Sequence, residues 1–133
     1  MKKSQVSTEF MFFVGAGFVL LAVYLLISYN YLDLTLKRRD INSAINLLEE
    51  LRNEINLASR VENGYTRKYV IPSNINKQNY TLTISGREIN VNFNGIDYAR
   101  LLATQVTVIG SVPVPGDTIV IKKENDAVKI QKY

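Results

Sequence analysis

The sequence contains neither cysteine nor histidine among its 133 residues, and it has only seven glycines. Without cysteine there is no disulfide and no thiolate ligand, and without histidine the commonest general base and metal ligand is missing. No glycine-rich phosphate-binding loop can be found along the chain. We therefore expect a protein that is not an enzyme and that has no metal site and no cofactor.

A long run of basic residues is also absent. Sixteen Lys and Arg against twelve Asp and Glu give a formal charge of +4. The basic residues occur in twos and threes, as in Lys37-Arg38-Arg39, and do not form the continuous basic surface that is typical of nucleic-acid-binding proteins. We therefore expect no nucleic-acid partner.

What the sequence does contain is one long uncharged segment, from Phe10 to Leu32. Apart from Ser28 and Asn30 it holds only apolar residues, tyrosine and two glycines. As a helix it would be about 34 Å long, and the hydrocarbon core of a bilayer is about 30 Å thick. The segment is therefore long enough to cross a membrane.

The charges that flank this segment give opposite indications of its orientation. Lys2 and Lys3 precede it and favour a cytoplasmic N-terminus, whereas the basic triplet at 37–39 follows it. A secretory signal peptide would have an apolar core of only about 7 to 15 residues. A plain signal anchor remains an alternative, as does the buried core helix of a soluble protein, although so short a chain has little protein with which to surround it.

The residues just before the apolar run are Gln5-Val6-Ser7-Thr8-Glu9. They resemble the class III signal peptide of archaeal type IV pilin-like proteins, in which a Gln-x-Ser-x-Glu pattern precedes an apolar helix. The resemblance implies that a membrane prepilin peptidase cuts between Ser4 and Gln5, on the cytoplasmic side. Glu9 then becomes the fifth residue of the mature chain. Ser4 departs from the glycine or alanine that is usual before the cut.

The resemblance implies a structural subunit, a pilin, of an archaeal type IV pilus-like filament used for adhesion or cell contact. The subunit would first be a single-pass protein of the cell membrane with a cytoplasmic N-terminus, and then part of an extracellular filament. Its expected partners are the prepilin peptidase, the pilus assembly machinery, membrane lipid before assembly and identical subunits afterwards. A minor pilin remains an alternative, as does a single-pass membrane protein that never polymerises and carries an extracytoplasmic β module for binding or assembly.

Four residues are expected to serve assembly. Cleavage would create a positive amine at Gln5, and the Glu9 carboxylate could pair with it, since a charge is costly in an apolar surrounding unless it is compensated. Gly15 and Gly17 lie within the apolar run, where small residues permit close approach of helices. Their spacing differs from the Gly-x-x-x-Gly pattern of dimerising helices.

Beyond the apolar run the helical period continues, with apolar residues at threes and fours to Ala58 and no proline before Pro72. This predicts one helix over 7–61, ended by a glycine cap at Asn63-Gly64. A second helix starting at Asp33, after a kink near 28–30, is the alternative. The expected divisions are the leader 1–4, a transmembrane and filament-core helix 5–32, its amphipathic continuation 33–63 and a β-rich head 64–133.

After Gly64 the apolar residues alternate with polar ones, which indicates short antiparallel strands. The predicted fold class is α+β, with a long N-terminal helix and a head of four or five antiparallel strands packed over its amphipathic half, as the resemblance also implies. A first hairpin is expected around Ser85-Gly86-Arg87 and a turn at Asn94-Gly95. The expected strands are 80–84, 88–93, 105–109, 118–122 and 127–131, with an edge strand at 69–71, a loop at 110–117 and an ambiguous segment at 96–103.

Asn79-Tyr80-Thr81 is the only Asn-x-Ser/Thr sequence in the chain. If the head lies outside the cell, Asn79 is a candidate N-glycosylation site.

Overall fold

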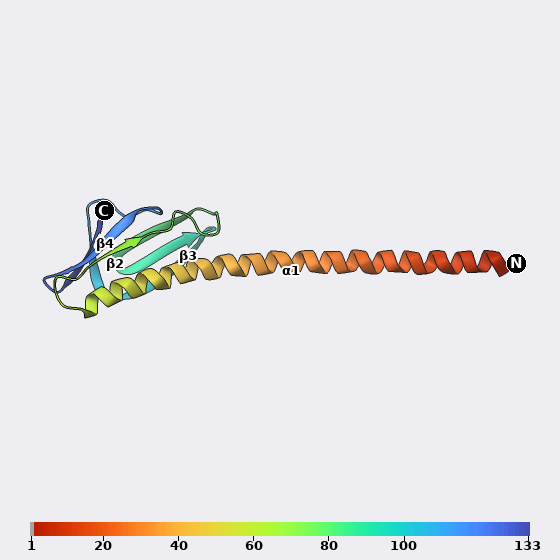
Figure 1. The fold of residues 1–133 in the computed structure, drawn as a ribbon, viewed down its shortest axis with the longest axis horizontal. Coiled ribbons are helices and arrows are strands. Elements are labelled where there is room, and N and C mark those ends of the chain that lie inside the picture. Colours follow the sequence, from red (N-terminus) through yellow and green to blue (C-terminus); the bar gives the residue numbers. More distant parts are fainter. Residues whose placement is uncertain (1) are drawn as a thin grey trace. The chain divides into compact units, whose positions relative to one another are not determined.

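A computed structural model describes the backbone of residues 2–133 and the side chains of residues 7–133. The described chain has the α+β layout that was predicted (Figure 1), one long N-terminal helix followed by five strands. The elements are α1 (Lys2–Arg60), β1 (Thr66–Val70), β2 (Tyr80–Phe93), β3 (Ile96–Ile109), β4 (Thr118–Glu124) and β5 (Ala127–Lys132). The chain separates into two compact units, Met1–Arg39 and Asp40–Tyr133, which we call the helical unit and the head unit.

The helix α1 is assigned without interruption from Lys2 to Arg60, so the single helix is confirmed and no second helix begins at Asp33. Its end differs from the prediction, because Gly64 does not cap it. Gly64 has a φ of +97° but lies in the turn after the helix, where its N–H donates to the carbonyl of Lys123 (2.9 Å). Lys123 closes the helix end instead, since its ammonium donates to the carbonyls of Ser59 (3.0 Å) and Val61 (2.8 Å).

The five strands form one sheet in the order β1-β4-β5-β3-β2. Three of the four neighbouring pairs are antiparallel, as predicted, but β3 and β5 are parallel. The parallel pair arises because the loop after β3 carries the chain past one strand position before β4 begins. The β4–β5 hairpin then returns β5 into the gap beside β3, in the same direction as β3.

The hairpin predicted around Ser85-Gly86-Arg87 is wrong, because β2 continues through this segment. The register with β3 shifts between Gly86 and Glu88, where β2 advances by two residues and β3 by five, from Leu101 to Val106, and Gly86 has a positive φ of +58°. The burial pattern changes at the same place. Ile84 and Ile89 are both buried although they are an odd number of residues apart, so the inward and outward alternation of β2 reverses across this irregularity.

The ambiguous segment 96–103 and the predicted strand 105–109 belong to one strand, β3. The turn between β2 and β3 is formed by Asn94 and Gly95, with φ values of +54° and +76°, as the Asn-Gly pair predicted. The terminal hairpin is confirmed as well, and Asn125 and Asp126 at its turn have φ values of +52° and +61°. The edge strand β1 begins at Thr66, three residues earlier than predicted.

The hydrophobic core joins one side of the C-terminal part of α1 to one face of the sheet. The helix contributes six residues to this core: Ala44, Leu47, Leu48, Leu51, Ile55 and Ala58. The same helix also satisfies backbone groups of β3, which β5 pairs only from Val106 onward. Asn56 accepts from the N–H of Ala103 (2.9 Å), and Arg52 donates to the carbonyl of Leu101 (3.1 Å). The amphipathic half of the helix therefore acts as part of the head.

Candidate membrane-crossing and assembly helix

The N-terminal part of α1 exposes apolar side chains on every side. Phe12 is 82% exposed and Leu26 is 66% exposed, although their side chains belong to the types most often buried in proteins. None of the most apolar 18-residue window is buried inside the chain. This segment is long and apolar enough to cross a membrane.

The exposure has a large free-energy cost in water. Burying one large apolar side chain is worth about 1.5 to 3 kcal/mol, and the segment exposes five phenylalanine and tyrosine rings between Phe10 and Tyr24. A further set of leucine, isoleucine and valine side chains follows the helix to Leu36. The total is on the order of tens of kcal/mol, which exceeds the net stability of a typical domain. Another apolar surface must therefore cover this helix.

Glu9 is the one carboxylate that precedes the uncharged run, and the structure places it on the exposed surface of α1. Together with Thr8, Phe12 and Phe13 it lines a shallow depression. No hydrogen bond or ion pair joins its side chain to another described residue. The side chains of Ser4 and Gln5 lie outside the described residues, so the expected pairing of Glu9 with the amine of Gln5 stays a prediction.

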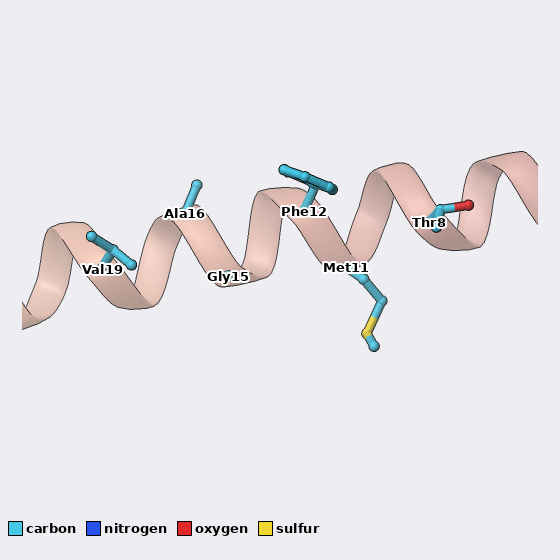
Figure 2. A pocket seen from close by; sticks show the side chains of 6 residues that line it. All are labelled: Thr8, Met11, Phe12, Gly15, Ala16 and Val19. Atoms are coloured by element: carbon cyan, nitrogen blue, oxygen red, sulfur yellow. The ribbon is translucent and has the colours of Figure 1, made fainter.

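Gly15 is one of the residues that line an open notch on one side of the helix; Figure 2 shows how their side chains lie. The notch is lined by Thr8, Met11, Phe12, Gly15, Ala16 and Val19. These positions are three or four residues apart and therefore share a helix face. A Cβ added at Gly15 would have no atom within 4 Å. The absence of a side chain here therefore has no packing reason within the chain itself.

Gly17 does not belong to this notch. Two residues along a helix correspond to a rotation of about 200°, so Gly15 and Gly17 lie on nearly opposite faces. A Cβ at Gly17 would also have no atom within 4 Å. Both glycines were predicted to serve assembly, and the helix geometry means that one partner helix cannot contact both at close range.

The sequence interpretation missed the other residues that line the notch beside Gly15. A second depression follows along the helix, lined by Ala22, Leu25, Leu26, Ser28, Tyr29 and Leu32. The signal that could have found this face is the spacing of seven residues that separates Thr8, Gly15 and Ala22. Small residues at this interval keep to one side of a helix.

Asn79 lies far from these residues in the sequence, in the head unit. It is exposed and directly precedes β2. Among the described residues, no three Asp or Glu side chains lie close enough together to hold a metal ion.

Comparison with known proteins gives no relative. No protein-family model matches the chain, and neither the curated proteins nor the solved structures contain a match to it. The resemblance to pilin-like proteins therefore depends on Gln5, Ser7 and Glu9, on the apolar run behind them and on the α+β layout.

Proposed function

We propose that this chain is the precursor of a structural subunit of an archaeal type IV pilus-like surface filament. The subunit is held in the cell membrane by the N-terminal part of α1 and is then assembled with identical subunits through the same helix. The observation that carries the proposal is the combination of an entirely unburied apolar window with a single carboxylate, Glu9, at its N-terminal end.

Lipid and identical helices are the two surroundings that could cover such a segment. A permanent membrane anchor needs only lipid, and a carboxylate at the edge of its apolar run gains only a modest attraction to the positive N-terminal end of its own helix, against the cost of a charge near hydrocarbon. In a filament the cost is offset, since cleavage before Gln5 creates a positive amine that must enter the same apolar core. Glu9, four residues further on, can pair with that amine in its own chain or in a neighbouring subunit.

The first test is the start of the mature chain. Cleavage before Gln5 removes Lys2 and Lys3 and lowers the formal side-chain charge from 16 − 12 = +4 to 14 − 12 = +2. Intact-mass analysis and N-terminal sequencing of membrane and sheared surface fractions measure the start directly. A mature chain that begins at Met1 or after Tyr31 contradicts the proposal.

The second test separates insertion from assembly by changing Glu9. Glu9→Gln and Glu9→Val should leave membrane insertion and cleavage close to wild type, because neither change makes the apolar run less hydrophobic. Incorporation into filaments should fall at least about tenfold, since an unpaired buried charge costs several kcal/mol. Immunoblots of membrane and sheared fractions, with electron microscopy of the latter, give the ratio of held to polymerised subunit.

Glu62→Gln is the matched control, because it removes an exposed carboxylate of the head and should leave the ratio unchanged. If Glu9→Val gives as much filament as the wild type, the proposed pairing of Glu9 with the Gln5 amine is wrong. Cleavage before Gln5 without any filament would favour the alternative of a membrane protein whose head acts as a monomeric module.

A further inference from the structure

The Asn79-Tyr80-Thr81 segment is presented by the fold in an alternating pattern. Tyr80 is only 6% exposed, and its hydroxyl donates to the carbonyl of Pro72 (2.5 Å). Asn79 and Thr81, on either side of it, are both exposed. Successive residues of an extended chain point to opposite sides. The buried ring of Tyr80 therefore places the Asn79 amide and the Thr81 hydroxyl together on the solvent side.

The turn before Asn79 is fixed by its own hydrogen bonds. Ile75 and Gln78 exchange two backbone hydrogen bonds of 2.9 Å each, and Asn76 and Lys77 between them have φ values of +49° and +66°. Ile75 is buried at 5% exposure and anchors the turn in the core. Because β2 is the last strand in the sheet order, no further strand covers the chain where it leaves this turn.

The same turn contacts the residue at which the head unit begins. Asn76 Nδ2 donates to Asp40 Oδ1 (2.8 Å), and Gln78 Nε2 donates to Asp40 Oδ2 (3.3 Å). Asp40 is the first residue of the head unit. Asn79, which follows Gln78 directly, therefore lies at the end of the head where the chain enters from the apolar run.

Chain length limits how far this end can be from a membrane. Asp40 follows Leu32, the end of the apolar run, by eight positions. Even fully extended, this stretch spans at most about 28 Å, at roughly 3.5 Å per residue. If the apolar run crosses a bilayer, Asp40 therefore lies within about 28 Å of the end of that run, and Asn79 directly follows Gln78, which contacts Asp40.

From these observations we propose that Asn79 carries an N-linked glycan, transferred at the outer membrane surface from a lipid-phosphate-linked sugar. In the transfer, Nδ2 of Asn79 forms a bond to the anomeric carbon of the sugar. The bond from that carbon to the phosphate oxygen of the lipid carrier breaks, the lipid phosphate leaves with the bonding electrons, and the amide nitrogen loses one proton to the transferase. The proposal rests on the outward position of the head under the proposed function.

The test uses the full chain in the cells that produce it, with mass spectrometry of the peptide containing Asn79. Wild-type protein from the membrane and from sheared surface material should show the added mass of at least one sugar residue on Asn79. Asn79→Gln and Thr81→Ala should both lose it. Thr81→Ser keeps the hydroxyl and should retain it.

Thr83→Ala is the matched control, since Thr83 is the next exposed threonine on the same strand and lies outside the acceptor sequence. It should retain the sugar. Unmodified Asn79 in the wild type overturns the proposal, and so does a sugar that persists in Thr81→Ala.

Failure of this proposal can be told apart from failure of the proposed function. A chain that is cleaved before Gln5 and polymerises with Asn79 unmodified contradicts the proposed glycosylation but supports the pilin proposal. A chain that is glycosylated at Asn79 but forms no filament supports the proposed glycosylation and contradicts the proposed filament function.

Discussion

The two halves of α1 have the same backbone structure but opposite surroundings. In the C-terminal half, Leu48 and Ile55 are completely buried against the sheet. In the N-terminal half, Phe12 and Leu26 have no such cover. The helix forms in both, because its backbone hydrogen bonds are local. The head unit is therefore stabilised by contacts within the chain, whereas the apolar side chains of the helical unit have no such contacts.

The carboxylates of Glu49 and Glu9 differ in the same way. In the head, the carboxylate of Glu49 contacts both Arg52 (3.0 Å) and Arg100 (2.5 Å), so that it links the helix to β3. In the helical unit, Glu9 has no such contact with a described residue. The Glu49 carboxylate of the head is used within the fold, whereas the Glu9 carboxylate of the helical unit is available to another chain.

The largest expected effect comes from separating the two regions. A truncated chain that starts at Leu34 should be soluble and monomeric with a β-rich circular dichroism spectrum, because the uncovered apolar run has been removed. The full chain should require detergent or lipid. Size-exclusion chromatography with light scattering measures the difference. Filaments formed by the truncated chain would show that the head drives assembly.

A matched pair of core and surface substitutions tests whether the head is independent of the helical unit. Ile55→Ala should lower the free energy of unfolding of the head by about 2 to 5 kcal/mol, the usual cost of a cavity at a fully buried site. Leu26→Ala should change it by less than about 0.5 kcal/mol. Urea unfolding of the full chain in detergent, followed by circular dichroism in the β region, gives both values. An equal loss in the two variants would mean that the units are energetically coupled.

The two glycines test whether one face of the helical unit is used in assembly. Gly15→Leu fills the notch and Gly17→Leu adds the same side chain to the opposite face. Neither should affect the head, because a Cβ added at either position would meet no side chain or other element within 4 Å. If subunits pack through the notch in the filament, Gly15→Leu should reduce the amount of filament in the sheared fraction several-fold more than Gly17→Leu does. Equal yields would show that the packing does not distinguish these faces.

The smallest effect concerns the pH dependence of the head alone. Burial raises the pKa of Tyr80 to about 12, against about 10 in an unfolded chain. Because the pKa of Tyr80 is higher in the folded than in the unfolded chain, the neutral Tyr80 hydroxyl stabilises the fold. This contribution is complete below about pH 10 and is lost as the pH rises towards about 12.

Tyr80→Phe should therefore make the fall in stability between about pH 10 and pH 12 shallower. At neutral pH it should cost about 1 kcal/mol, because the hydrogen bond to the Pro72 carbonyl is lost. Tyr133→Phe is the control, since Tyr133 is 75% exposed. Urea midpoints across this pH range measure how steeply the stability falls with pH. An unchanged slope in Tyr80→Phe would contradict the raised pKa of Tyr80.

Several features of the fold could be predicted because their causes are local in the sequence. The apolar period and the absence of proline before Pro72 predicted α1, and the Asn94-Gly95 pair predicted its turn from the conformational preference of those two residues. The exposed apolar run and the candidate residues Glu9, Gly15 and Asn79 were also visible without a structure. Their chemistry depends on residue type and spacing along one helix or strand.

The remaining features were decided by tertiary structure, because they depend on residues that are distant in the sequence. Gly86 looked like a hairpin turn, but β2 continues through it with a register shift against β3, and Ile84 and Ile89 on either side are buried in the same core. The parallel pairing of β3 with β5 required the position of β4. The place of Asn79 required the contact between Gln78 and Asp40 (3.3 Å) across 38 residues. Such contacts form only when the sheet packs on the helix, because the free energy that selects them is the burial of a core shared by all the elements.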